Sequence, residues 1–177
     1  MGRINRHQPV KLITSLFFKE EEIFKDSKKT LIRRFGVTDF ESRSIPFTHT
    51  DYYEKEFGRH LARRFLSFKR LIRPEELPGI KVFTNKIESK SSKEACRRIN
   101  IDPGYINLAK LVLATAKDYG HRTYLGKGIF AEVTLFYREG SFRPWEWTYP
   151  DYKTPESIGI FNRIRATYAQ QSCTLRT

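Results

Sequence analysis

The sequence is poor in cysteine and has no long apolar segment. It contains two cysteines in 177 residues, and Cys173 lies in the polar C-terminal segment QSCTLRT. Two thiols without a CxxC spacing form neither a metal knuckle nor a disulfide framework, so we expect a reducing compartment. The longest apolar run, residues 12–18, is shorter than the roughly 20 residues of a membrane-spanning helix. The basic start MGRINRHQP has no apolar stretch behind it, which is not typical of a secretory signal. We therefore expect a cytoplasmic protein with no membrane partner.

Acidic residues are also scarce relative to basic ones. There are 33 Lys and Arg against 20 Asp and Glu, which gives a formal net charge of +13. Such an excess attracts nucleic acid, anionic lipid or the phosphates of nucleotides, although a basic solvated surface without a partner explains it equally well. The length fits one domain, and 39% hydrophobic residues provide a core. We expect a single domain over residues 1–177, with flexible ends at 1–8 and 170–177.

Apolar spacings predict the secondary structure. In the first half they predict strands at 10–18 and 39–47, a helix at 20–35 that Gly36 ends, a weaker strand at 61–72, and a helix at 78–93. In the second half they predict strands at 108–116 and 129–137, turns at 117–121 and 138–141, and a helix that Thr154 caps with Pro155 in its first turn. This order predicts an α+β fold, in which helices pack on one face of a mixed, mainly antiparallel sheet. The first six elements fit a ferredoxin-like core, to which a β-hairpin is added.

Two details of the second half bear on the site. The segment IDPG, residues 101–104, is interpreted as a turn, because Pro103 and Gly104 favour a bend and Asp102 is a common turn residue. In the strand 129–137, strict alternation predicts two faces. One face carries Ile129, Ala131, Val133, Leu135 and Tyr137, and the other carries Phe130, Glu132, Thr134 and Phe136. Glu132 then faces solvent unless it belongs to a site.

A basic stretch with aromatic residues precedes the second helix. Its cations are Arg59, Arg63, Arg64, Lys69, Arg70 and Arg73, and no acidic residue interrupts them. Phe65 and Phe68 lie between them. Cations that neutralise phosphates and rings that stack on bases are typical of RNA-binding surfaces. The alternative is that the two phenylalanines belong to the core and the arginines are simply solvated.

The segment GHRTYLGKG, residues 120–128, is suited to an anion. Glycines let backbone N–H groups approach a phosphate, and Arg122 and Lys127 supply positive charge. The spacing is not that of a P-loop, because Gly128 stands where the magnesium-binding hydroxyl is required and a strand follows instead of a helix. A tight β-turn is the alternative explanation.

Two further segments invite a nucleotide interpretation. TNKIE, residues 84–88, resembles the guanine-recognition sequence of GTPases, but Glu88 replaces the required Asp and the segment lies in a predicted helix. We therefore interpret it as helix surface. WEWTYPDY, residues 145–152, concentrates aromatic rings that either stack on a base or pin a loop onto the core.

Several titratable residues are candidates for an acid–base or metal site. They are His49, Asp51, Asp102, His121 and Glu132. Histidine titrates near neutral pH, and carboxylates orient it or share a metal ion. No HxH, HExxH or DxD spacing connects them, so the metal, any cofactor and the enzymatic status of the protein stay open.

Long segments of the chain resemble one protein family. PFTHTDYYEKEFG, RRFLSF, NIDPGYINLAKLVLATAKDYGHRTYLGKGIFAEVTLFY and WTYPDY are similar to the prokaryotic domain of unknown function DUF4416, over about residues 9–168. Members are sometimes labelled GTP-binding, so the resemblance implies a nucleotide ligand. It also emphasises polar and glycine positions. These are Asp51, Tyr52, Tyr53, Glu56, His121, Arg122, Tyr124, Gly126 and Gly128.

The sequence therefore leads to one main hypothesis and two alternatives. The main hypothesis is a pocket for a nucleotide or another phosphorylated ligand, with metal-assisted phosphoryl chemistry as an option. Phosphate would be bound by Arg64, Lys110, His121, Arg122, Gly126, Lys127 and Gly128, and acid–base or metal chemistry would come from His49, Asp51, Glu56, His121 and Glu132. The alternatives are a non-catalytic RNA-binding module and an assembly factor for an acidic protein. The oligomeric state stays open.

Overall fold

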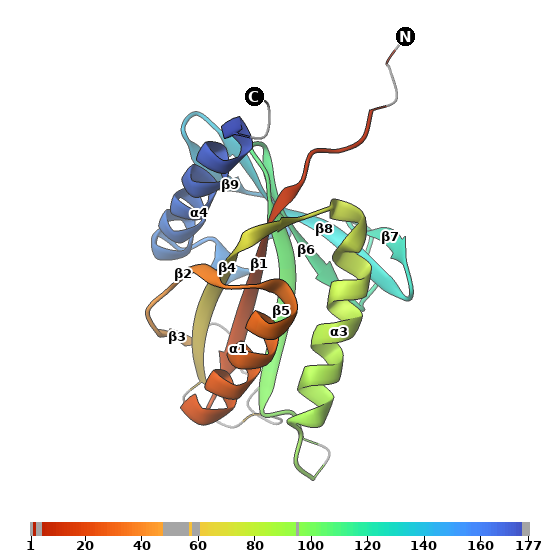
Figure 1. Cartoon of the computed structure of the whole chain (residues 1–177), viewed down its shortest axis with the longest axis vertical. Coiled ribbons are helices and arrows are strands. Elements are labelled where there is room, and N and C mark those ends of the chain that lie inside the picture. Colours follow the sequence, from red (N-terminus) through yellow and green to blue (C-terminus); the bar gives the residue numbers. More distant parts are fainter. Residues whose placement is uncertain (1, 3–4, 48–56, 58–60, 95, 175–177) are drawn as a thin grey trace.

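The computed structural model describes residues 2, 5–47, 57, 61–94 and 96–174. Figure 1 shows their arrangement as a twisted sheet with long helices packed against it. The strands are β1 (Val10–Phe18), β2 (Thr38–Glu41), β3 (Ile45–Phe47), β4 (Leu61–Ile72), β5 (Ile99–Ile106), β6 (Lys110–Thr115), β7 (Thr123–Gly126), β8 (Ile129–Arg138) and β9 (Ser141–Pro144). The helices are α1 (Glu21–Phe35), α3 (Leu77–Lys90) and α4 (Pro155–Thr174), with short 3₁₀ turns η2 (Pro74–Glu76) and η3 (Pro150–Tyr152).

All the strands described join one sheet with the order β2-β4-β1-β5-β6-β8-β7. The short strand β3 pairs with β4, and β9 pairs with β8. Every pair is antiparallel. Strands β1 and β2 flank β4, and β4 and β5 flank β1, so β1-α1-β2 and β4-α3-β5 are two interlocked split βαβ units. The α+β class is confirmed. The ferredoxin-like core consists of β1, α1, β2, β4, α3 and β5, so its sixth element is β5 and not the strand predicted at 108–116.

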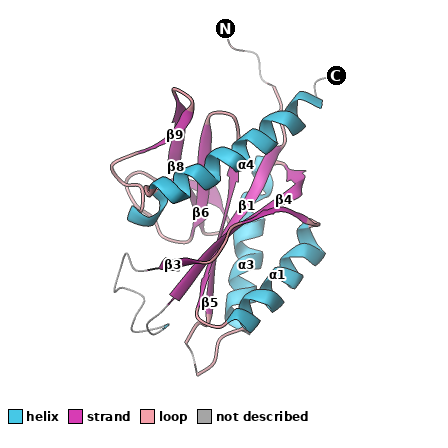
Figure 2. Cartoon of the chain, turned by 90° about the vertical axis from the view of Figure 1, so that its left-hand side faces the viewer, coloured by secondary structure: helices cyan, strands magenta, loops and turns pink. Residues whose placement is uncertain are grey.

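Helices cover both faces of the sheet. On one face, α1 and α3 share a core with β1, β4 and β5, in which Phe24, Leu31 and Ile80 are buried. On the opposite face, Phe161 and Ile164 of α4 pack against Phe65 and its neighbours, and Figure 2 shows α4 crossing the strands on that side. The expectation that helices pack on one face therefore holds for α1 and α3 but not for α4. Strands β1 and β4 carry apolar side chains on both faces of the sheet, so helices cover both faces.

Two boundaries differ from the expectation. The predicted strand 39–47 is divided into β2 and β3. The C-terminal residues 170–174 continue α4, and Gln171 accepts a hydrogen bond of 2.6 Å from the buried ammonium group of Lys11. Lys11 also binds Asp39 and the carbonyl of Phe68 at 3.1 Å, and its burial lowers the pKa of its amine. This buried cation therefore ties the end of α4 to the middle of the sheet.

A β-bulge at Thr134 corrects the predicted faces of β8. Leu111 pairs with Leu135 while the next residue, Val112, pairs with Val133, so β8 carries one extra residue at this point. Val133 therefore packs under α3, while Leu135 packs on the α4 side. Strict alternation predicted one shared face for these two side chains. The prediction was wrong because the spacing of apolar residues does not reveal a bulge.

The sheet divides where β5 and β6 part. Strand β6 pairs with β5 only from Gly104 to Ile106, whereas β5 remains paired with β1 from Ile99 onward. Beyond this point β6 continues with β8 alone, through Ala114 and Thr115. We call this opening the sheet fork. The IDPG segment is thus part of a strand and not a turn, and Asp102 is a strand residue.

Proline and glycine mark the fork for physical reasons. Pro103 has no N–H to donate, so it suits a strand edge that has just lost its neighbour. At Gly104 the two strands are in close contact, because a Cβ built there would lie 2.3 Å from the carbonyl oxygen of Val112 and 2.7 Å from Leu113. A strand residue with a side chain cannot occupy this position without moving β6.

No helix in the part of the chain that the structure describes is long and apolar enough to cross a membrane.

Replacing Gly104 should destabilise the domain. We expect Gly104→Ala to lower the free energy of unfolding by about 1–3 kcal/mol, because the methyl group overpacks the β5–β6 contact. Gly159→Ala in α4 is the matched control. A methyl group there meets no atom within 4 Å, so helix propensity should raise stability by about 0.5–1 kcal/mol. Urea unfolding followed by circular dichroism measures both, and equal stabilities of the two variants would contradict the role of Gly104.

Candidate functional site

A cavity of about 780 Å³ occupies the sheet fork. Its walls come from the polar side of α3, the diverging ends of β5 and β6, the turn at residues 116–122 and the loop at residues 145–152. Phe17 and Arg63, from the adjoining ends of β1 and β4, complete the lining. Segments that are distant in the sequence therefore meet around one hollow.

Helix α3 straddles the fork with an amphipathic surface. Its Ile80 and Ile87 pack on the β1–β4–β5 side, while Leu77 packs against β6 and β8. Between these apolar contacts, Lys81 and Glu88 are 5% exposed each and face the cavity. Their spacing of i and i+7 places both on one side of a helix.

These two side chains satisfy the backbone of β5 where β6 is missing. The ammonium group of Lys81 donates to the carbonyl of Ile101 at 3.0 Å and to Asp102 at 3.1 Å. The Glu88 carboxylate accepts the N–H of Ile101 at 2.8 Å and an Arg97 N–H at 3.2 Å. A buried strand edge must find such partners, so this pair replaces the neighbouring strand. Glu88 is therefore buried, whereas the sequence suggested that it lies on the helix surface. Burial raises the pKa of its carboxyl group, although nearby Lys81 opposes the shift.

A second polar network lies across the cavity around Glu132. This side chain is 2% exposed, which corrects the expectation that it faces solvent. Its Oε2 accepts from Nε of Arg122 at 2.9 Å, and its Oε1 accepts from the hydroxyl of Thr134 at 3.1 Å. Arg122 also donates to the hydroxyl of Tyr149 at 2.7 Å and to the carbonyl of Lys117 at 2.9 Å. The turn at 116–122 is thus fixed to β8 through one buried ion pair.

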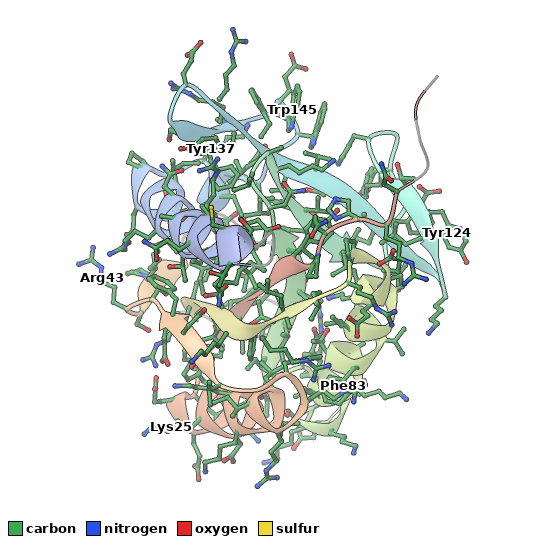
Figure 3. The ribbon with its side chains drawn as sticks, turned by 45° about the horizontal axis from the view of Figure 1, so that its top comes forward. Lys25, Arg43, Phe83, Tyr124, Tyr137 and Trp145 are labelled. Atoms are coloured by element: carbon green, nitrogen blue, oxygen red, sulfur yellow. The ribbon has the colours of Figure 1, made fainter. Side chains whose placement is uncertain are left out.

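His121 belongs to the same network and to a column of aromatic rings. Its Nε2 lies 3.3 Å from Oε2 of Glu132. The imidazole stacks between Tyr119 and Trp147, with ring centroids 6.1 and 5.3 Å away and planes within 18° and 16° of parallel. Trp145 continues the column at 5.2 Å from Trp147, and Figure 3 shows it at the surface of the molecule. The rings therefore hold the imidazole in a fixed orientation at the cavity wall.

The loop at 145–152 is pinned to β8 by its own hydrogen bonds. The indole N–H of Trp147 donates to the carbonyl of Val133 at 3.1 Å, and the hydroxyl of Thr148 donates to the carbonyl of Thr134 at 2.6 Å. These carbonyls lie between the segments of β8 that pair with β7 and with β9. The WEWTYPDY segment thus forms a pinned loop that also presents rings to the cavity.

Arg63 and Tyr152 form another part of the wall. Arg63 pairs with Asp151, and its guanidinium lies over the ring of Tyr152 at 5.3 Å. The hydroxyl of Tyr152 lies beside that of Ser15, and neither has a well-formed hydrogen bond within the described part of the chain. Burial raises the pKa of the Tyr152 hydroxyl, and the hydroxyl oxygen itself is covered by the protein.

The lining carries charges of both signs. Among the described residues, five Lys and Arg side chains line the cavity, and so do four carboxylates. The cations are Arg63, Lys81, Arg97, Lys117 and Arg122, and the acids are Glu88, Asp102, Glu132 and Asp151. Lys117 is exposed and the Arg97 side chain is 33% exposed, so these two cations are the most accessible to a ligand from solvent.

Of the residues predicted for phosphate binding or for acid–base chemistry, four meet in this cavity: Asp102, His121, Arg122 and Glu132. His49, Asp51 and Glu56 lie outside the described residues, so their roles stay predictions. Within the described residues, no group of three or more His, Cys, Asp or Glu side chains is arranged to hold a metal ion.

The other predicted phosphate ligands do not line the cavity. Arg64 lies on the α1 side of β4, where it pairs with Glu21 at 3.0 Å and Glu41 at 3.2 Å. Lys110 begins β6 at the end opposite the fork. Side chains alternate between the two faces of β4, so Arg64 points away from the cavity. Lys110 lies at the wrong end of β6 to line it.

The glycine segment forms a tight connection between β7 and β8. Gly126, Lys127 and Gly128 all have positive φ angles, of 100°, 58° and 72°. This left-handed backbone explains both glycines and agrees with the β-turn alternative. Residues 126–128 are not among the described residues that line the cavity, unlike His121 and Arg122 of the same segment.

The basic stretch of β4 is not one surface. Arg63 faces the cavity while Arg64 faces α1, and both pair with acids. Phe65 and Phe68 are 0% exposed, so they belong to the core and cannot stack on bases. Lys69 is exposed, but the described part of this stretch has no exposed aromatic ring beside its cations.

Sequence reasoning missed the α3 side of the site. Lys81, Asn85 and Glu88 line the cavity together, and their shared helix side was readable from the i, i+4, i+7 spacing. Arg97 and Asn100 were missed as well, because nothing local distinguishes them from surface residues.

The chain belongs to the family described as Domain of unknown function (DUF4416), whose profile matches residues 8–168. The resemblance read from the sequence is therefore confirmed. A search of curated proteins and a search of solved structures found no match.

The buried Glu88 should make stability depend on pH. Folding raises the pKa of this carboxyl group above 4.5, so the native state holds the proton more tightly than the unfolded chain does. The free energy of unfolding should therefore fall as pH rises from about 4.5 through the raised folded value. In Glu88→Gln this contribution is absent, while the amide oxygen still accepts the N–H of Ile101. We expect the stability of the variant relative to wild type to increase with pH across that window.

Urea unfolding at several pH values between 4.5 and 7.5 measures this difference. Glu75→Gln, at an exposed position of η2, corrects for the loss of one negative charge from the chain. A relative stability that stays constant or declines as pH rises would contradict the assignment.

Proposed function

We propose that the protein binds a nucleotide or another phosphorylated small molecule in the fork cavity. The observation that carries this proposal is the convergence of cationic side chains and aromatic rings from separate elements on one hollow of about 780 Å³. Ligand sites typically enclose about 300–1,000 Å³ and combine apolar walls with a few placed polar groups. The cavity has both the size and the lining of such a site.

The cationic rim suits a phosphate. Arg97 and Lys117 belong to segments on either side of the fork, and both are accessible to solvent. Ion pairs within the protein hold Arg63, Lys81 and Arg122 in place, so their remaining N–H groups are oriented before a ligand arrives. Charge-assisted hydrogen bonds from such donors are stronger than those between neutral groups.

The rings suit a planar group next to that phosphate. Trp147 and Tyr149 are 39% and 41% exposed and line the cavity with Phe17. Aromatic surfaces bind the faces and edges of nucleobases with little sequence preference.

The RNA-binding alternative receives less support. The predicted stacking rings, Phe65 and Phe68, are buried, and the neighbouring Arg63 and Arg64 point to opposite sides of β4. An acidic protein partner would use the remaining basic surface, but no particular face of the described residues favours it. A pocket for a small molecule therefore explains more of the geometry than either alternative.

The phosphate contribution can be measured directly. We expect adenosine and guanosine monophosphates to bind at least about tenfold more tightly than the matching nucleosides, because charge-assisted contacts are worth about 1.5–3 kcal/mol. Isothermal titration calorimetry measures both pairs. Lys117→Met should reduce the difference severalfold, whereas Lys25→Met, on the outward side of α1 (Figure 3), should not. Raising the salt concentration should weaken the nucleotides more than the nucleosides.

Two results would reject the proposed function. One is the absence of binding by any of the four compounds. The other is equal affinity for each nucleoside and its monophosphate, since the cationic rim would then contribute nothing.

A further inference from the structure

His121 has the surroundings of a working base and not those of a core histidine. Its ring is clamped between Tyr119 and Trp147, which fixes its plane. The side chain is 26% exposed and lines the cavity. A histidine retained only for packing would have its two nitrogens satisfied and its ring covered. Here the side chain is partly exposed, and the only hydrogen bond of the ring within the described part of the chain is at Nε2.

Glu132 sets the proton position on this ring. Its Oε2 lies 3.3 Å from Nε2 of His121 and also accepts from Arg122. An ionised carboxylate only accepts hydrogen bonds, so neutral His121 carries its proton on Nε2. Nδ1 then holds a lone pair, and it has no hydrogen-bond partner within the described part of the chain. This is the arrangement by which a carboxylate orients a histidine for general base catalysis.

The charges around His121 indicate which reaction it would catalyse as a base. Arg122, Lys117 and Arg97 line the same cavity, and cations of this kind stabilise the negative charge on the oxygens of a phosphoryl group in transfer. We propose that His121 is the general base, and Glu132 its positioning residue, for the hydrolysis of a phosphate ester bound in the fork cavity. This inference rests on the proposed function and adds a reaction to it.

The step balances with water as the only co-reactant. Nδ1 of His121 takes one proton from a water molecule as its oxygen forms a bond to phosphorus. The bond from phosphorus to the ester oxygen breaks, and the electron pair leaves with that oxygen. The leaving oxygen then takes a proton from solvent, and the imidazolium of His121 returns its own proton to solvent. The products are an alcohol and inorganic phosphate.

Phosphate release tests the step. Purified protein is incubated with adenosine and guanosine monophosphates, and inorganic phosphate is measured colorimetrically. We expect release from at least one compound, and a loss of at least about 100-fold in His121→Asn, which is the usual contribution of a general base. His7→Asn is the matched control, because His7 is exposed and bonds only to its neighbour Gln8 in the described structure. Calorimetry with the same nucleotides shows whether each variant still binds.

Chemical rescue separates a base from a structural ring. His121→Ala leaves a ring-sized gap between Tyr119 and Trp147, so added imidazole should restore part of the lost rate. Pyrrole has a similar shape but no basic nitrogen, and it should restore none. In Glu132→Gln, nitrogen-15 NMR should show a larger share of His121 with its proton on Nδ1, together with a lower rate.

The outcomes distinguish the two proposals. Wild-type protein that binds nucleotides but releases no phosphate overturns the catalytic role and leaves the binding function intact. An unchanged rate in His121→Asn, or rescue by pyrrole as good as that by imidazole, also overturns it. If no nucleotide binds, the binding function itself has failed.

Discussion

The separation of β5 from β6 is the constraint on which the rest of the structure depends. A strand that loses its neighbour inside a protein leaves N–H and C=O groups without partners, which costs free energy. At Ile101 these groups bind Glu88 and Lys81 of α3 instead. The helix must therefore lie directly over the fork, with its polar side turned inward. The cavity exists because side chains, which are thinner and more adjustable than a strand, complete the sheet at this point.

Both walls of the cavity follow the same principle. On the β8 side, the carbonyls of Val133 and Thr134 receive hydrogen bonds from the loop at 145–152, and the buried Glu132 is neutralised by Arg122. Charged groups that would be costly to bury alone are paired here. Each pair also restricts the rotamers of its members, so the polar groups that face the cavity are held in position before any ligand enters.

Periodicity predicted most of the fold, but it could not predict the site in full. Apolar spacing identified β1, α1, β4, α3 and β8, because one-sided burial leaves a regular pattern. The proline and glycine of IDPG suggested a turn, whereas they mark the end of strand pairing, and the two uses look identical in sequence. The bulge at Thr134 and the burial of Glu88 depend on partners distant in the chain. His121, Arg122 and Glu132 were found because a glycine-rich turn next to a strand concentrates them locally.

The aromatic column gives the protein an internal optical reporter. The two tryptophans of the chain, Trp145 and Trp147, lie in one loop and stack on each other at the margin of the cavity. Their emission therefore comes from this margin and not from the hydrophobic cores beneath α1 and α4. Occupancy of the cavity can thus be followed by light, without any label and without confusion from events elsewhere in the domain.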